Sequence, residues 1–169
     1  MLLRHAKSDW PEGLADHERP LAPRGRAAAP LMARYMAAEG LLPDLALVSP
    51  ARRTRETWEL VADALGHEVA VTSEPRIYQG RVEGLMAMLT EIEAAVDTVL
   101  VVGHNPGMAE LTLLLAGAGD RRSLAAVQRK FPTAALSVIR IDSDWADIAP
   151  FKGRLERFVT PKSLGGEDD

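Results

Sequence analysis

Three short segments of the sequence combine histidine, arginine and small polar residues directly after apolar stretches. They lie at residues 4–8 (Arg-His-Ala-Lys-Ser), 49–57 (Ser-Pro-Ala-Arg-Arg-Thr-Arg-Glu-Thr) and 103–107 (Gly-His-Asn-Pro-Gly). If the apolar stretches are strands of a doubly wound sheet, their carboxyl ends bring the three segments to one edge. Two histidines, several arginines and the free N–H groups of a helix start then converge, which indicates a phosphate site.

The residue types in these segments suit phosphoryl transfer. A tetrahedral dianion is bound well by the planar, permanently charged guanidinium of arginine, which donates two parallel hydrogen bonds. Nearby cations lower the pKa of a histidine, so one nitrogen of His5 is expected to be unprotonated near neutral pH and able to attack phosphorus. The arginines then stabilise the charge on the phosphoryl oxygens.

Each of these residues also has a structural explanation. A single histidine at a strand end is more often structural than catalytic, and Gly-His-Asn-Pro-Gly is also typical of a strand-to-helix turn. A basic helix start around Arg53 is usually a solvated surface. A metal site on His5 and His104 is disfavoured, because no carboxylate lies at ligand spacing and the cations oppose a metal ion. His17 and His67 are expected to be exposed and outside the site.

The stretches around the three segments alternate between strand and helix patterns. This alternation favours a mainly parallel central sheet flanked by helices on both faces. Beyond residue 131 the pattern changes, and the last two strands are expected at sheet edges. The predicted strands are 44–49, 68–72, 98–102, 135–141 and 154–159, and the predicted helices are 21–39, which contains Pro30, 52–65, 82–95 and 108–116.

Composition limits the class of protein. A chain of 169 residues with 47% apolar content can bury one core, so we expect one domain over residues 1–162 and a disordered acidic tail over 163–169. The net charge of -4 argues against a nucleic-acid partner. The absence of cysteine excludes disulfides and thiolate metal sites and fits a cytoplasmic protein. No apolar stretch reaches the roughly 18 residues of a membrane span, so no membrane partner is expected.

The three segments resemble motifs of the histidine phosphatase superfamily, which has the phosphoglycerate mutase-like fold. Residues 4–8 stand where the family has Arg-His-Gly and a following Thr or Ser, and they match the Arg-His-Ala-Lys-Ser variant of its SixA-like branch letter for letter. Trp10 falls on the family's tryptophan, and residues 19–25 resemble the approach to its first helix. Residues 49–57 fit its Ser-Pro-x-x-Arg-x-x-x-Thr pattern, and residues 103–107 match its late strand end.

The resemblance implies a role for each site residue. His5 is implied to be the nucleophile that becomes phosphorylated, and His104 is implied to contact the transferring phosphoryl group. Arg4, Arg53 and Ser8 are implied to bind the phosphate, and water then attacks the phosphohistidine. No metal or organic cofactor is implied.

The implied partner is a phosphorylated protein or a small phosphorylated substrate, and phosphohistidine on a protein is the favoured one. Two other functions stay open. One is a phosphatase for a sugar or nucleotide phosphate, and the other is a non-catalytic module that binds phosphate or a phosphopeptide.

The sequence departs from the family pattern at the acid that protonates the leaving group. Glu74 is the carboxylate nearest the expected place, Asp9 and Glu83 are alternatives, and the absence of any such acid also stays open. A phosphohistidine needs the acid least, because its imidazole leaves more readily than an alkoxide. In addition, only three residues precede Arg4, so either the first strand is short or the native start lies upstream.

Overall fold

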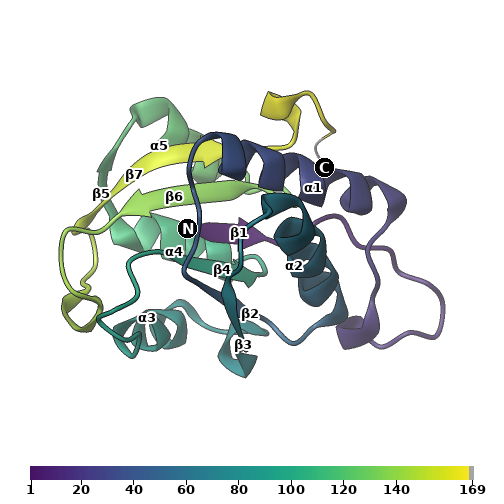
Figure 1. Cartoon of the computed structure of the whole chain (residues 1–169), viewed down its shortest axis with the longest axis horizontal. Helices are drawn as coiled ribbons and strands as arrows, with labels where there is room; N and C mark the ends of the chain where they lie inside the picture. The colour runs from purple at the N-terminus through teal and green to yellow at the C-terminus, as the bar shows by residue number, and fades with distance from the viewer. Residues whose placement is uncertain (168–169) are drawn as a thin grey trace.

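Short apolar runs form the central strands, and segments rich in alanine and leucine form most of the helices. The computed structural model describes residues 1–167, in which seven strands join in one sheet (Figure 1). The strands are β1 (Leu2–Arg4), β2 (Leu45–Val48), β3 (Ala70–Ser73), β4 (Val99–Gly103), β5 (Ala116–Gly119), β6 (Leu136–Arg140) and β7 (Gly153–Val159). The α-helices are α1 (Pro23–Ala38), α2 (Arg52–Leu65), α3 (Val82–Thr90), α4 (Gly107–Leu115) and α5 (Arg121–Arg129).

The sheet is parallel on one side and mixed on the other. Strands β3, β2, β4 and β1 run parallel in that spatial order. Strand β6 pairs antiparallel with both β1 and β7, and β5 closes this side by pairing parallel to β7. The segments that follow β1, β2 and β4 therefore meet at one edge of the sheet.

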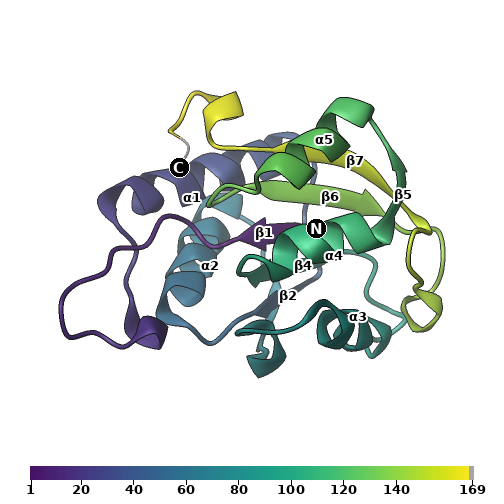
Figure 2. The ribbon, with the colours of Figure 1, turned by 180° about the vertical axis from the view of Figure 1, so that it is seen from behind.

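Helices cover both faces of the sheet. Helices α1 and α2 lie on the face seen in Figure 1, and α3, α4 and α5 lie on the opposite face, seen in Figure 2. Because side chains alternate along a strand, Leu3 packs into the core under α1 and α2, whereas Leu2 packs into the core on the other face. Val102 and Val101 of β4 divide in the same way, so this buried central strand is held from both sides.

The predicted fold class is confirmed, but several details of the predicted elements are wrong. Helix α2 has the predicted bounds, whereas α3 ends earlier than predicted, at Thr90. Strands β6 and β7, which the sequence pattern places at sheet edges, lie inside the sheet because β5 forms that edge. Neither β5 nor α5 is predicted, since the Ala-Gly-Ala-Gly sequence of β5 has low strand propensity.

The C-terminal residues differ in part from the expected tail. Ser163 and Leu164 belong to a 3-10 helix, η4 (Lys162–Leu164), and Leu164 packs against the core under α1 and α2. Residues 168–169, which the tail prediction also covers, lie outside the described residues. Within residues 1–167, no helix combines the length and the apolar character needed to cross a bilayer.

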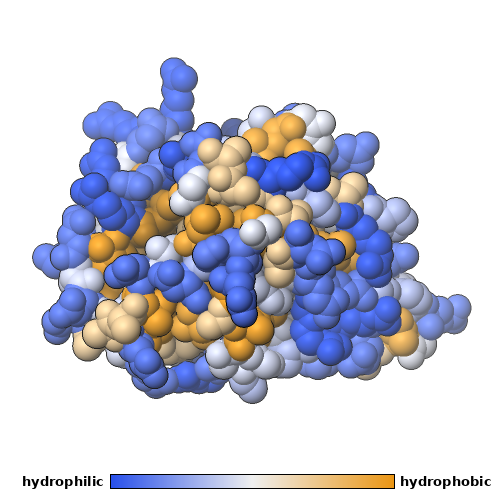
Figure 3. Space-filling view, viewed as in Figure 1, coloured by the Kyte–Doolittle hydropathy of each residue, from blue (hydrophilic) through white to orange (hydrophobic). Residues whose placement is uncertain are grey.

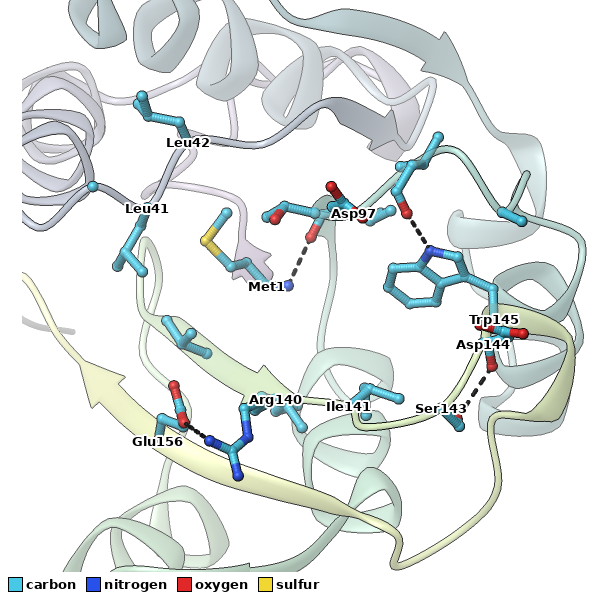
Figure 4. Close-up of a pocket in the computed structure, with 17 residues that line it drawn as sticks. Met1, Leu41, Leu42, Asp97, Arg140, Ile141, Ser143, Asp144, Trp145 and Glu156 are labelled. Carbon is cyan, nitrogen blue, oxygen red and sulfur yellow. Dashed lines mark hydrogen bonds and ion pairs between the residues drawn. The ribbon is translucent and has the colours of Figure 1, made fainter.

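One cavity lies at the amino ends of the parallel strands, away from the three polar segments. Apolar side chains gather there, around the N-terminus on the face shown in Figure 3. The cavity holds about 370 Å³, and in Figure 4 the amino group of Met1 donates to the Val99 carbonyl at 2.7 Å while the Trp145 indole donates to the Val96 carbonyl at 2.6 Å. None of the described residues that line it belongs to the three polar segments.

Helix α1 approaches the segment after β1 so closely that only glycine fits at position 25. A Cβ added to Gly25 would fall on the main-chain carbonyl of Lys7. We expect Gly25→Ala to lower the free energy of unfolding by about 1–3 kcal/mol, the usual cost of overpacking. Urea unfolding followed by circular dichroism measures this change.

A matched control is available in helix α3. A Cβ added to Gly84 meets nothing within 4 Å, so Gly84→Ala is expected to stabilise the protein by about 0.5–1 kcal/mol through its higher helix propensity. Equal effects of the two substitutions would contradict the close approach of α1 to Lys7.

Candidate active site

The end of β1 places Arg4 and His5 beside the end of β4. The His5 amide donates to the Gly103 carbonyl at 2.9 Å, and Arg4 pairs with Gly103 in the parallel register. On the other side, the Ala134 amide is 3.1 Å from the carbonyl oxygens of both Arg4 and His5. Main-chain hydrogen bonds on both sides thus hold the backbone of this segment in place.

The imidazole of His5 is held in one tautomer. Its Nδ1 lies 2.8 Å from the Ala6 carbonyl oxygen, which can only accept, so Nδ1 carries the proton and Nε2 carries a lone pair. The side chain is buried, with 8% of the residue exposed. Burial first, and then the electrostatic effects of His104 and of the cations Arg4 and Arg53, hold the pKa of His5 well below 6.5 despite the hydrogen bond to Ala6. The ring is therefore neutral near pH 7.

The second histidine of the site follows β4. The rings of His104 and His5 have their centroids 5.2 Å apart, and Nε2 of His104 lies 2.8 Å from the hydroxyl oxygen of Ser49. Ser49 is fully buried directly after β2, so this contact brings the second polar segment to the first and third. Burial, followed by the charge of Arg53, lowers the pKa of His104 to about 4. This imidazole is also neutral near pH 7.

Two arginines from different elements point their guanidinium groups into the same region. Arg4 donates from NH1 to the Phe131 carbonyl at 2.9 Å. Arg53, in the first turn of α2, is buried with 6% exposure. It donates from NH1 to the main-chain carbonyl of Asp16 at 2.6 Å and from NH2 to the Asp16 carboxylate at 3.0 Å. Both cations are held by protein acceptors while they face the histidines.

These side chains line an open polar cavity of about 240 Å³. Among residues 1–167, the buried polar atoms of its lining that have no hydrogen-bond partner include Nε of Arg53, Nδ1 of His104 and Oδ1 of Asn105. Buried polar atoms are rarely left unpaired, so they mark a place for a polar ligand. The lining consists of Arg4, His5, Lys7, Ser8, Arg19, Arg53, His104, Asn105 and Thr133. An adjoining cavity of about 590 Å³ shares Arg53, His104 and Asn105.

The three carboxylates considered as acids lie outside this cavity. Glu74 accepts hydrogen bonds from the Arg76 side chain and amide, and these bonds lower its pKa. Asp9 is exposed and accepts from the Trp10 amide. Glu83 lines only the adjoining cavity, and its side chain is 73% exposed. No Asp or Glu stands among the described residues that line the 240 Å³ cavity.

Comparison with known proteins agrees with this geometry. The family model described as histidine phosphatase superfamily (branch 1) matches residues 1–91, a stretch that contains the first two polar segments. The chain belongs to the histidine phosphatase superfamily. An uncharacterized protein of Mycobacterium tuberculosis is 34% identical over 162 residues, which cover 95% of this chain and all of the relative.

Within the histidine phosphatase superfamily, the chain falls in the SixA-like branch. A solved structure assigned as the phosphohistidine phosphatase SixA of Agrobacterium tumefaciens is 31% identical, with a TM-score of 0.78 and coverage of 95% of this chain and 96% of that one. A second, from Nakamurella multipartitia, is 29% identical, with a TM-score of 0.78 and coverage of 95% of both chains. The protein is accordingly a phosphatase with the phosphoglycerate mutase-like fold.

The sequence predicts the residues from strand ends but misses those from loops. His5, His104, Arg4, Arg53 and Ser8, the five predicted site residues, all line the 240 Å³ cavity. The contributors that it misses include Asp16, Thr133 and the carbonyl of Phe131. The one local signal for Asp16 is its spacing of three residues from Arg19, with which it pairs at 3.2 Å. His17, expected to be a bystander, packs its ring edge-on against the Tyr78 ring at 5.0 Å.

The low pKa values of the two histidines predict a pH dependence of stability. In the unfolded chain a histidine binds a proton near pH 6.5, whereas His104 in the folded protein does so only near pH 4. The contribution of the two histidines to the free energy of unfolding should therefore be constant above about pH 6.5 and fall as the pH drops from there toward 4. The slope is about 1.4 kcal/mol per pH unit for each histidine that stays neutral.

Nuclear magnetic resonance titration of the histidine ring protons checks this expectation, together with urea unfolding at pH 7 and pH 5. The His104→Asn variant should lose less stability than the unsubstituted protein over this interval. Titration of the His5 or His104 ring near pH 6.5 would contradict the environment described here.

Proposed function

We propose that the protein hydrolyses phosphohistidine, or a closely related phosphoramidate, through a phosphorylated His5. The observation that carries the proposal is the meeting of two neutral imidazoles, 5.2 Å apart, with the guanidinium groups of Arg4 and Arg53 around one cavity. Such a cavity complements a phosphoryl group, because the cations bind its oxygens while an unprotonated nitrogen attacks its phosphorus.

The proposed reaction consists of two displacements at phosphorus. First, the lone pair on Nε2 of His5 forms a bond to phosphorus as the bond to the substrate's imidazole nitrogen breaks, and the departing imidazole takes a proton from water. Second, the oxygen of a water molecule attacks phosphorus and the bond to Nε2 breaks. Orthophosphate leaves, the proton released in this step neutralises the hydroxide ion that the first step left in solvent, and His5 returns to its neutral form.

The other cavity residues bind the phosphoryl group or stabilise the charge on its oxygens. Arg4 and Arg53 bind the non-bridging oxygens and stabilise their charge in the transition state. His104, neutral and 5.2 Å from His5 between ring centroids, contacts the same phosphoryl group. Ser8 is buried, lines the cavity and accepts a hydrogen bond from Arg19 at 2.8 Å, so its hydroxyl proton can be donated to a phosphate oxygen.

The distribution of carboxylates favours a nitrogen leaving group over an alkoxide. An alkoxide leaves slowly unless an acid protonates it, and the 240 Å³ cavity has no Asp or Glu among the described residues of its lining. An imidazole departs more easily. The adjoining 590 Å³ cavity, which shares Arg53 and His104 with the phosphate cavity, offers space for the leaving imidazole and the peptide that carries it.

Kinetics with three phosphorylated compounds test the proposal. Phosphoramidate and N-phosphohistidine should be hydrolysed in the presence of a chelator, and a simple alkyl phosphate should be hydrolysed far more slowly. We expect His5→Ala to lower kcat by about 10³-fold or more, because the nucleophile is removed. The matched control is His67→Ala, which removes an exposed histidine outside the cavity and should leave kcat unchanged.

Three other results point elsewhere. Equal turnover by the protein and its His5→Ala variant would remove His5 from the reaction. Faster hydrolysis of a sugar or nucleotide phosphate than of phosphohistidine would indicate a small-molecule phosphatase. Phosphate binding without turnover of any compound would indicate a binding module.

A further inference from the structure

Asp16 makes more contacts with the side chains around the phosphate cavity than any carboxylate considered from the sequence. It lies in a 3-10 helix, η1 (Asp16–Glu18), in the long loop between β1 and α1. Two of its oxygens accept from Arg53: the main-chain carbonyl from NH1 at 2.6 Å, and Oδ2 of the carboxylate from NH2 at 3.0 Å. Both terminal nitrogens of the guanidinium are therefore anchored to a single residue.

The carboxylate of Asp16 is itself held by two further donors. The Tyr78 hydroxyl donates to Oδ2 at 2.9 Å, and NH1 of Arg19 donates to Oδ1 at 3.2 Å. Arg19 also donates to the Ser8 hydroxyl at 2.8 Å and to the Asp9 carbonyl at 3.1 Å. Asp16, which anchors Arg53, is thus hydrogen-bonded to Tyr78 and, through Arg19, connected to Ser8.

The loop that carries Asp16 is closed at its base. Ser8 and Leu21 form an isolated antiparallel bridge, and the Asp9 amide donates to the Pro20 carbonyl at 2.9 Å. The base of the loop is visible in Figure 1, where the purple chain leaves β1 and returns to α1. The loop is therefore tied to the cavity at its base, through Ser8, and at η1, through Arg53.

We propose that Asp16 is a positioning residue that fixes the guanidinium of Arg53 for phosphoryl transfer, with Tyr78 and Arg19 fixing Asp16 in turn. This proposal rests on the proposed function, since it assigns Arg53 to the phosphoryl oxygens. With one N–H of each terminal nitrogen occupied by Asp16, the remaining donors of Arg53 include the buried Nε, which has no partner among residues 1–167. These donors are left for the phosphate.

The need for an anchor follows from the nature of an arginine side chain. Arginine has several rotatable bonds, and a guanidinium held by one end only can take many orientations. Transition-state stabilisation requires donors fixed in place before the charge develops. In the free protein the Asp16 carboxylate also offsets the positive charge of Arg53, which faces Arg4 and two imidazoles in the same cavity.

Asp16 is not suited to act as the missing acid. Although partial burial raises its pKa, the hydrogen bonds from Tyr78, Arg19 and Arg53 outweigh that effect and lower the pKa to about 2. The carboxyl group therefore holds no proton to donate near neutral pH. Its contribution to the reaction passes through Arg53.

A double-mutant cycle distinguishes this role from a structural or an acid role. The rate measured is kcat/KM for phosphoramidate in Asp16→Ala, Arg53→Ala and the double variant. Asp16→Ala should lower kcat/KM by about 100-fold, the cost of a misplaced catalytic group. In the Arg53→Ala background the same substitution should change it by no more than about 2-fold, because the group that it positions is gone. Arg53→Lys supplies a second background with measurable turnover.

Two further variants complete the design. Both Asp16 variants keep the main-chain carbonyl as an acceptor, but Asp16→Asn also keeps one side-chain oxygen, so it should retain more activity than Asp16→Ala. Glu74→Gln is the matched control: it weakens a carboxylate–arginine pair, Glu74 with Arg76, that lies outside the cavity, and it should leave kcat/KM within about 2-fold. Circular dichroism and urea unfolding establish that each variant is folded.

The outcomes separate this inference from the proposed function. Full activity of Asp16→Ala would overturn the positioning role while leaving His5 as nucleophile. An equal fold loss from that substitution in the unsubstituted protein and in the Arg53→Ala variant would do the same. A loss confined to poor leaving groups would also overturn it, because a positioning residue affects all substrates alike. If His5→Ala and Arg53→Ala are both fully active, the proposed function fails instead.

Discussion

The parallel pairing of β1 with β4 is the constraint on which the site depends. The hydrogen bond from the His5 amide to the Gly103 carbonyl fixes the register of β1 against β4. Arg4 and His5 therefore lie beside the residue that precedes His104, and this register alone brings the two imidazoles together. Strand β6 fixes the same segment from the other side. Both strands are buried between layers of helices, so the separation of the two rings is fixed by the core.

Burial and positive charge act together on the chemistry of this pair. Two imidazoles that would be partly protonated in water are kept neutral, because a proton on either ring would lie in a poorly solvated place beside two guanidinium groups. The same cations that prevent protonation attract a phosphoryl dianion. The Ala6 carbonyl then decides which nitrogen of His5 carries the lone pair. One local charge pattern thus favours both the nucleophile and its substrate.

Much of the fold could be predicted from the sequence, and so could the site residues that lie at strand ends. A residue at the end of a parallel strand has a fixed place once the strand is recognised, and this holds for His5, Ser49 and His104. Asp16 could not be found in this way, because its partners Arg53 and Tyr78 are distant in sequence and the loop that carries it, between β1 and α1, has no periodic pattern. Strand β5 cannot be predicted locally, because its Ala-Gly sequence has a weak strand propensity and the strand forms only through pairing with β7.

The central claim is that a phosphoryl group is carried on Nε2 of His5, and trapping that species is its most direct test. The protein is mixed with phosphoramidate, quenched in alkali within the first turnovers, and digested for mass spectrometry and phosphorus magnetic resonance. We predict one phosphoryl group on the peptide that contains His5, bound to the ring nitrogen remote from Cβ, stable in alkali and lost in acid. Turnover with no phosphorylated His5 at any quench time, or with the group on another residue, would contradict the mechanism.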